Sequence, residues 1–321
     1  MKNFICVLGL AATLFLAIRV GSAQQQAGKA LEPAWAFPVP SEQQPAAEDN
    51  GQPKHVPGST RAYIKAQIED LTNSTDWFPD EHPTAPTVVT HVGAKGALAC
   101  GTCHLMSGLG HPESANLAGL PAAYIEAQMD DFRSGARIDP ARMNVIARAI
   151  SLEDSRAASE YFASVKSKPW EEVTETATVP QTYIARTRMR FVLPGGGPEP
   201  IGDRIIEVPK NTELAQLRDP NSGFLVYAPI GSIKKGEFLA TTGGSGKTVG
   251  CDNCHGEGLT GGRFGEPGIA GRSPMYLARQ LYGFKRFTRN GPDAQLMQPV
   301  VENLSDEDIL DLAAYLASLN P

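Results

Sequence analysis

The sequence predicts a mainly α protein in which two similar helical units stand in tandem, with a small β-containing insertion between them. The helical units are predicted by a residue pattern that recurs 152 to 154 positions apart. The insertion is predicted by short β-branched and aromatic runs between Pro and Gly in residues 169–230. We therefore expect an N-terminal segment at 1–23, an arm with a covering helix at 24–87, and helical units at 88–168 and 231–321.

The repeat is clearest around one helix in each unit. The shared residues are Gly119, Tyr124, Gln128 and Phe132 in the first unit and Gly271, Tyr276, Gln280 and Phe284 in the second. Tyr, Gln and Phe at positions i, i+4 and i+8 lie on one face of a helix. Farther along, Ser151 and Ser305 each precede an amphipathic helix with acidic residues in its first turn, which is an N-cap pattern.

Residues 1–23 read as a secretory signal. Lys2 gives a short positive region, residues 4–18 are largely apolar, and small residues precede a cleavage site near Ala23. An uncleaved N-terminal anchor is the alternative. Cleavage removes Lys2 and Arg19, so the remaining chain has 27 of the 29 Lys and Arg against 35 Asp and Glu. This acidic balance argues against nucleic acid as a partner, and export predicts a periplasmic protein.

Four of the five cysteines form two C-x-x-C-H motifs, at 100–104 and 251–255. This motif is the attachment signature of c-type haem. Two thiols about one turn apart can add to the two vinyl groups of one porphyrin, and the adjacent imidazole then lies beneath the iron as its proximal ligand. The expected attachment residues of two haem c groups are Cys100, Cys103, Cys251 and Cys254, and the expected proximal ligands are His104 and His255.

Three other interpretations of the cysteines explain less. A thioredoxin-like redox pair needs a βαβ context, which the sequence lacks. A zinc site needs four ligands at regular spacing, whereas the two cysteine pairs lie 151 residues apart. Two local disulfides would leave both histidines without a role.

Methionine is predicted as the second axial ligand of both irons. Met143 and Met297 recur 154 residues apart, each eight residues before the capping serine. A thioether is a soft ligand that favours reduced iron and raises the reduction potential. Replacement of a methionine by His91 or His111, which would give a bis-histidine haem, is the alternative.

These residues resemble class I cytochromes c, especially the tandem di-haem cytochrome c4 family. The resemblance covers about residues 90–168 and 231–321 and rests on C-x-x-C-H, the following L-A-G or I-A-G, the Y-x-x-x-Q-x-x-x-F helix, the methionine and the final Y-x-A-S. It implies that the carbonyl of a proline two residues before L-A-G supports the proximal histidine. Pro267 occupies that position in the second unit, and Ala115 occupies it in the first. The arm and the insertion depart from the family.

The N-terminal region outside the resemblance predicts an arm and one helix. Residues 24–58 are rich in Gln, Pro and Ala, which is typical of a mobile or wrapped arm. Residues 59–75 have an apolar helical face, and Ser59 is a candidate cap.

The insertion and the approach to the second motif give three further expectations. Residues 182–193 read as a strand, and alternation places Arg186, Arg188 and Arg190 on one face, either solvated or paired with haem propionates. Residues 232–239 should form the first helix of the second unit. The Gly-rich stretch 241–248 lacks the first glycine of a phosphate loop and reads as a flexible loop.

The sequence predicts an electron-transfer protein and not an enzyme. His/Met iron has no open position for substrate, so it only cycles between Fe(II) and Fe(III). The expected partners are redox proteins: a donor dehydrogenase and an acceptor oxidase or cytochrome. One alternative is a permanent cytochrome subunit of an exported dehydrogenase or oxidase, including a membrane-bound complex. A di-haem peroxidase or a haem sensor would need an open sixth position.

Overall fold

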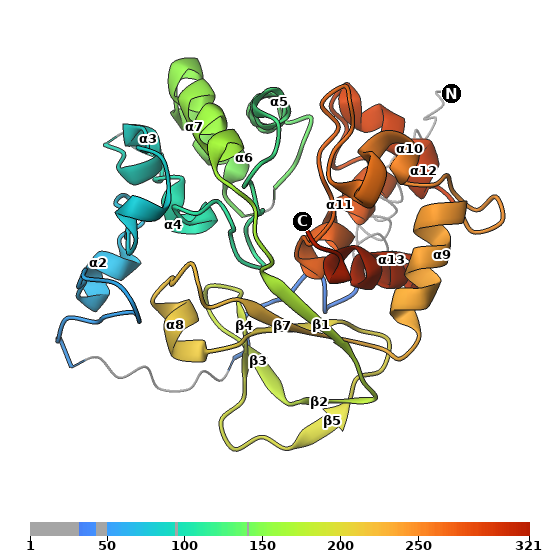
Figure 1. The fold of residues 1–321 in the computed structure, drawn as a ribbon, viewed down its shortest axis with the longest axis horizontal. Helices are drawn as coiled ribbons and strands as arrows, with labels where there is room; N and C mark the ends of the chain where they lie inside the picture. Colours follow the sequence, from blue (N-terminus) through green and yellow to red (C-terminus); the bar gives the residue numbers. More distant parts are fainter. Residues whose placement is uncertain (1–31, 43–49, 94–95, 140) are drawn as a thin grey trace, which may run out of the picture. The chain divides into compact units, whose positions relative to one another are not determined.

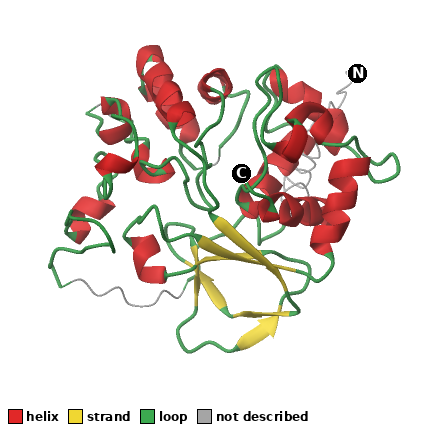
Figure 2. Ribbon diagram, viewed as in Figure 1, coloured by secondary structure: helices red, strands yellow, loops and turns green. Residues whose placement is uncertain are grey.

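The structure is a computed structural model that describes residues 32–42, 50–93, 96–139 and 141–321. Residues Trp35–Pro321 form one compact unit; the other unit, Met1–Ala34, is described only at residues 32–34, so the expected signal segment lies outside the described residues. Within Trp35–Pro321, two helical groups lie beside each other, and the strands lie below both in the view of Figure 1. Helices and strands are segregated in this way (Figure 2), which agrees with the predicted mainly α class.

The first helical unit contains the predicted repeat helix and capped helix. Its helices are α3 (Thr87–Thr90), α4 (Gly101–His104), α5 (Ala122–Ser134), α6 (Met143–Ala149) and α7 (Leu152–Ser164). The backbone N–H of Asp154 donates to the Ser151 hydroxyl at 3.0 Å, so Ser151 caps α7 as predicted. Phe162 of α7 is fully buried in the core of this unit.

The second helical unit is built around its last helix. Its helices are α9 (Ser232–Thr242), α10 (Asp252–His255), α11 (Pro274–Lys285), α12 (Gln298–Val301) and α13 (Asp306–Ser318). Ser305 caps α13 through Asp308, as predicted. Gly236 lets α9 approach α13 closely, because a Cβ there would lie 2.0 Å from the carbonyl oxygen of Asp311. Helix α9 confirms and extends the helix predicted at 232–239.

The insertion forms three small sheets and one short helix. Its elements are β1 (Glu171–Glu175), β2 (Thr178–Pro180), β3 (Thr182–Ile184), β4 (Arg190–Val192), β5 (Pro198–Pro200), β6 (Ile206–Pro209), α8 (Thr212–Gln216) and β7 (Phe224–Ala228). The largest sheet has the order β1-β7-β6, in which β1 is parallel and β6 antiparallel to β7. The pairs β2–β5 and β3–β4 are antiparallel.

The prediction of one strand over residues 182–193 is wrong. These residues form the hairpin β3–β4, closed by a hydrogen bond from Ala185 N to Met189 O at 2.9 Å. Arg186 and Arg188 lie in the turn, so they do not share a strand face with Arg190. The turn was not recognised because Arg188 takes its left-handed position (φ 69°), where Gly or Asn is usual.

The helix predicted over residues 59–75 is also much shorter than expected. Only α2 (Lys65–Glu69) is helical, and a 3₁₀ turn follows at Pro79–Glu81. Ser59 does not cap α2; its hydroxyl donates to Trp77 O at 2.6 Å. After α2 the Asp70 carboxylate accepts the Thr72 N–H at 2.9 Å, a local side-chain bond that competes with helix formation.

The described end of the arm is wrapped onto the second helical unit. Trp35 and Ala36 are buried in that unit's core, and the Phe37 ring meets Tyr282 edge-on at 5.9 Å between centroids. Ser41 N then donates to Ile184 O in β3 at 2.9 Å, which ties the arm to the insertion. In the part of the chain that the structure describes, we find no helix with the length and apolar character needed to cross a membrane.

Strand β6 carries a carboxyl group into the interior. Glu207 is 0% exposed, and its carboxylate accepts the Ser273 hydroxyl at 2.8 Å and hydrogen-bonds with Glu171. Burial raises the pKa of Glu207 to about 7, and burial together with Glu207 raises the pKa of Glu171. The folded protein therefore retains a proton that the unfolded chain would release near pH 4.5.

We expect the free energy of unfolding to fall as the pH rises from 5 to 8, because the folded state binds more protons than the unfolded state over this range. The Glu207→Gln variant should remove on the order of 2 kcal/mol of this dependence. Denaturant unfolding at several pH values would measure it. Glu172→Gln, on the exposed side of β1, is the matched control and should leave the slope unchanged. Equal slopes in the wild type and Glu207→Gln would contradict this assignment.

Candidate haem sites

The first C-x-x-C-H motif forms the single turn α4, held against the preceding N-terminal region. Cys100 N donates to Val88 O at 3.2 Å, which fixes the start of the turn. At its end, His104 Nδ1 lies 2.8 Å from the carbonyl oxygen of Ala115. A carbonyl only accepts, so Nδ1 carries the proton and Nε2 keeps its lone pair for a metal ion. Burial lowers the pKa of His104, which favours this neutral form.

The second motif repeats this geometry. His255 ends α10, its Nδ1 donates to the carbonyl oxygen of Pro267 at 2.8 Å, and burial lowers its pKa. Pro267 and Ala115 occupy the same position of the repeat. The first unit therefore needs no proline, because the backbone carbonyl accepts the hydrogen bond whichever side chain accompanies it.

The donor atoms fit a thioether-linked haem better than the alternatives. All four cysteines of the two motifs are free thiols. Burial raises the pKa of Cys100 to about 12 and that of Cys251 to about 11, whereas a thioredoxin-like pair needs a lowered thiol pKa. Across the described ranges, no three His, Cys, Asp or Glu residues are grouped so that they could hold a metal ion.

Each predicted ligand methionine lies in the same unit as its motif. Met143 begins α6 and packs, with Cys100, against the core of the first unit. Its backbone N–H donates to the Asp139 carboxylate at 2.7 Å. Met297 ends the 3₁₀ turn Asp293–Met297 and packs, with Cys251, against the core of the second unit. Ligation by Met143 and Met297 stays a prediction.

The two candidate replacement histidines are placed differently. His91 is exposed, and its Nδ1 hydrogen-bonds with Asn73 Oδ1 at 2.6 Å. His111 lies on the loop after α4, where burial and nearby cations, one of them on Arg218, lower its pKa to about 3. Because His111 neighbours His104 on the proximal side, its position does not suit a ligand on the opposite haem face.

Sequence comparisons identify the family. The family model of cytochrome c oxidase, cbb3-type, subunit III, matches residues 241–316. Cytochrome c-554(548) of Halomonas halodenitrificans is 39% identical over 75 residues, which are 23% of this chain and 90% of that protein. The chain belongs to the c-type cytochromes.

Longer matches extend across both units of this cytochrome. The thiosulfate dehydrogenase electron acceptor of Stutzerimonas stutzeri is 27% identical over 236 residues, or 72% of this chain and 84% of that protein. Cytochrome c4 of Pseudomonas aeruginosa is 25% identical over 230 residues, or 71% and 87%. These relatives confirm the tandem di-haem type, the covalently bound haem c cofactors and the electron-transfer function.

The residues that join the two haem units were missed in the sequence. Arg137 donates to Gln128 of its own unit at 2.7 Å and to Gln280 of the other at 2.6 Å, while Arg289 donates to Gln128 at 2.9 Å. Each guanidinium also reaches a tyrosine of the opposite unit, Arg137 to Tyr276 at 3.2 Å and Arg289 to Tyr124 at 2.8 Å. Arg137 and Arg289 are themselves 152 residues apart, so extending the repeat search would have found them.

The repeat helices of this cytochrome thus face each other. The backbone supports the junction, because Ile138 N donates to Thr288 O and Asn290 N to Ala136 O, each at 2.7 Å. Tyr and Gln on the common face of α5 and α11 are contacts between the units as well as core residues. The junction between the units is therefore built from residues that recur in both units.

The two motifs differ in exposure, although their local geometry is the same. Gly101 and Thr102 of the first motif are buried, and Arg218 of the insertion donates to the Thr102 carbonyl. In the second motif, residues 252–254 are exposed, and nearby Phe264 is 94% exposed. Among the described residues, the insertion therefore covers the first motif, whereas the second motif is exposed.

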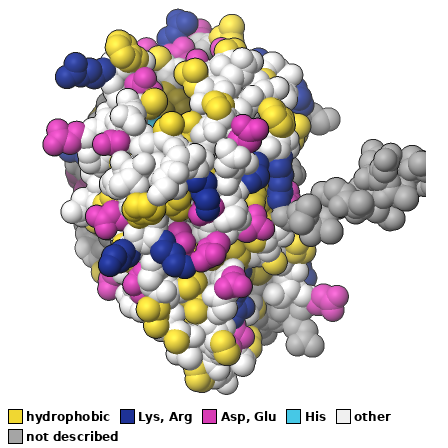
Figure 3. Space-filling view, turned by 90° about the vertical axis from the view of Figure 1, so that its right-hand side faces the viewer, with side chains coloured by type: hydrophobic (Ala, Val, Ile, Leu, Met, Phe, Trp, Pro, Cys, Tyr) yellow, Lys and Arg dark blue, Asp and Glu magenta, His cyan; other side chains and the backbone are white. Residues whose placement is uncertain are grey.

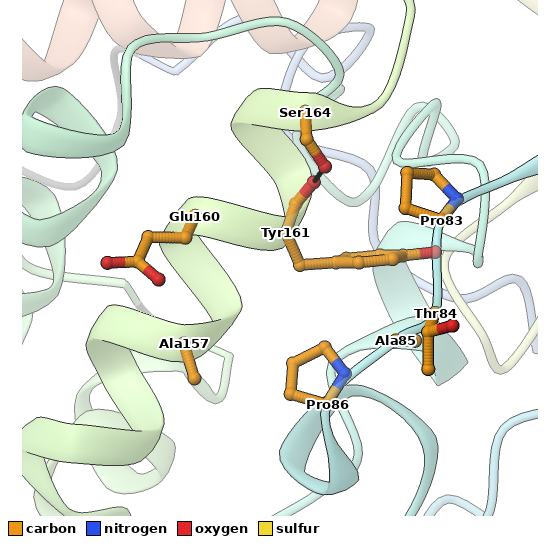
Figure 4. Close-up of a pocket in the computed structure, with 8 residues that line it drawn as sticks. All are labelled: Pro83, Thr84, Ala85, Pro86, Ala157, Glu160, Tyr161 and Ser164. Atoms are coloured by element: carbon orange, nitrogen blue, oxygen red, sulfur yellow. Dashed lines mark hydrogen bonds between the residues drawn. The ribbon is translucent and has the colours of Figure 1, made fainter.

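The predicted haem-binding residues line neither of two surface hollows. One, of about 380 Å³, lies between residues 83–86 and α7; Figure 4 shows the Tyr161 ring beside this segment, with Glu160 directed away. The other, of about 610 Å³, lies between residues 75–83 and 164–168. Both hollows lie where the N-terminal region covers the first haem unit.

We expect Arg137→Ala and Arg289→Ala each to destabilise the cytochrome by about 1–3 kcal/mol, because charge-assisted hydrogen bonds and their buried partners are lost. The double variant should be less destabilised than the sum, since both cations share Gln128 and repel each other. Chemical unfolding of the four proteins would measure the coupling. Arg156→Ala, an exposed control, should add to Arg289→Ala without coupling. Strict additivity of Arg137→Ala and Arg289→Ala would show that the two arginines do not act together at the junction.

Proposed function

We propose that this cytochrome is an exported relay that passes single electrons between a dehydrogenase and an oxidase or second cytochrome. The observation that carries the proposal is the pair of matching 2.8 Å bonds from motif histidines to backbone carbonyls. The proposed attachment and axial residues are Cys100, Cys103, His104 and Met143 for the first haem and Cys251, Cys254, His255 and Met297 for the second.

The bound haem supplies a reversible one-electron centre, and the chain sets its environment. Donation from Nδ1 to a carbonyl fixes the orientation of each imidazole and raises its basicity toward iron. Met143 and Met297 would each supply a thioether sulfur as the second iron ligand, and a haem held in this way would offer no open position for substrate. Thioether ligation, together with the packing of Cys100 and Cys251 against apolar cores, would favour moderate to high reduction potentials.

Two further features support an exported protein that works with a dehydrogenase. The residues at 1–23 carry the features of a secretory signal, so we propose a periplasmic location. One relative is named a thiosulfate dehydrogenase electron acceptor, so we propose a dehydrogenase as the donor. The cover over the first motif favours, as a second candidate, a permanent subunit of such a complex.

We further propose that transient partners approach the second haem. Its motif is exposed and carries the acidic side chain of Asp252, with acidic Glu257 just after the motif and apolar Phe264 nearby. The side of the molecule with the second unit faces the reader in Figure 3, where acidic, basic and apolar side chains are mixed. Such a surface suits brief, electrostatically guided encounters with a basic partner.

The ligand assignment predicts two distinct spectroscopic losses. Met143→Leu should abolish the methionine-to-iron charge-transfer band of the first haem only, and Met297→Leu that of the second, because leucine has no donor atom. Each variant should bind carbon monoxide at the opened haem after reduction. Visible and near-infrared spectra of the oxidised and reduced holoproteins would measure this.

Met129→Leu, in helix α5, is the matched control and should retain both bands. A wild-type protein that already lacks one band and binds carbon monoxide would overturn the closed-site relay and favour catalysis or sensing. Retention of both bands in Met143→Leu or Met297→Leu would instead refute that ligand alone.

The docking assignment predicts a local charge effect. Asp252→Lys should lower the rate constant for electron exchange with a lysine-rich monohaem cytochrome c by about threefold or more at low salt, because it reverses a charge at the exposed motif. Stopped-flow kinetics over a range of ionic strength would measure it. Glu160→Lys, exposed on α7 of the first unit, carries the same charge change and should have little effect. Equal effects of the two variants would contradict a specific docking side.

A further inference from the structure

One buried arginine contacts the proximal loops of both haem units. Arg272 is 6% exposed, and its guanidinium donates to Gly268 O at 3.3 Å within its own unit. It also donates across the junction to Asn116 O at 2.9 Å and to Ala118 O at 3.4 Å. Burial lowers the pKa of Arg272 to about 10, so the group is still a cation at neutral pH.

The contacted carbonyls lie next to the carbonyls that hold the histidines. Asn116 directly follows Ala115, the acceptor for His104, and Gly268 directly follows Pro267, the acceptor for His255. The two neighbouring peptide units share one Cα, so once one unit is fixed only the φ and ψ angles of that residue remain to orient the other. One guanidinium therefore restrains the acceptor loops of both histidines.

The repeat does not generate this contact. Arg272 is offset by 152 residues from Leu120, which cannot donate a hydrogen bond. The next residue, Ser273, caps α11 and donates to Glu207 of the insertion at 2.8 Å. Arg272 is thus a single, asymmetric link placed where the two units and the insertion meet.

A second arginine provides a contrast in charge. Arg279 of α11 donates to Pro112 O in the first unit and to Ala36 O at 3.1 Å, but to no carbonyl beside a histidine acceptor. The carboxyl groups of Glu113 and Glu207 interact with its charge, which partly opposes the rise in pKa that burial gives each of them. The ionisable neighbours that act most strongly on Arg272 are two tyrosines, so its charge remains largely uncompensated.

We propose that Arg272 is a positioning residue that locks the proximal histidine loops of both haems into one arrangement and sets both reduction potentials together. The proposal rests on iron ligation by His104 and His255. The reduced state of each haem carries one more electron, so a nearby uncompensated cation favours reduction of both. Its planar guanidinium spreads the donors over three nitrogens, each of which contacts a different carbonyl, whereas the three donors of lysine all lie on one nitrogen.

The test is a potentiometric titration of the holoprotein, followed by visible absorption, for wild type, Arg272→Leu and Arg272→Lys. Arg272→Leu should shift the reduction equilibrium of both haems toward the oxidised form by up to about tenfold, which is 59 mV for one electron. Arg272→Lys keeps the charge, so it should shift the potentials less. It should still move the proton NMR resonances of both axial histidines in the oxidised protein, because the three-carbonyl contact is lost.

Arg279→Leu is the control from the same junction and should shift either equilibrium by less than about twofold, because Arg279 contacts no carbonyl beside a histidine acceptor. A shift at the second haem alone would overturn the proposed link, since Arg272 would then act within its own unit. A lower melting temperature with unchanged potentials and resonances would show that Arg272 is only a structural contact. If Arg272→Leu does not fold, the axial-histidine resonances of Arg272→Lys provide the test of the proposal instead. A wild type without two low-spin haems would instead refute the ligand assignment.

Discussion

A half-buried imidazole whose Nδ1–H donates a hydrogen bond to a backbone carbonyl is the constraint on which this structure depends. His104 and His255 can present Nε2 to iron only if that acceptor is in place. The acceptor comes from a loop eleven or twelve residues farther along the chain, so the loop, the α4 or α10 turn and the following helix must be built together. This requirement explains why the repeat is strongest between each motif and its α5 or α11 helix.

The part of the fold that could be predicted from the sequence is the part with local signals. Periodicity and capping identified α5, α7, α11 and α13 because their signals are local: an apolar face and a serine before acidic residues. The C-x-x-C-H motifs and the recurrence of Met143 and Met297 located the candidate sites without any coordinates. Domain boundaries at 88, 169 and 231 stay predictions, because residues Trp35–Pro321 pack as one unit.

What the sequence could not reveal depends on tertiary contacts. Sequence propensity predicted neither the turn at Arg188 nor the short length of α2. An unusual φ angle at Arg188 and a local hydrogen bond to Asp70 after α2 override the side-chain patterns there. The contacts of Arg137, Arg289 and Arg272 were not predicted, because their partners are carbonyl, amide and hydroxyl oxygens of the other unit. Long-range pairing of a buried cation with uncharged acceptors leaves no charge pattern to read.

The cover over the first motif joins two distant parts of the chain. The carbonyl of Thr102, which lies between Cys100 and Cys103, accepts a hydrogen bond from Arg218, 116 residues farther along the chain. Cys100 and Cys103 are partly accessible, whereas Cys254 of the second motif is exposed. Any opening of the first motif's turn must therefore break a contact with the insertion, so the stability of this turn depends on the folding of the insertion.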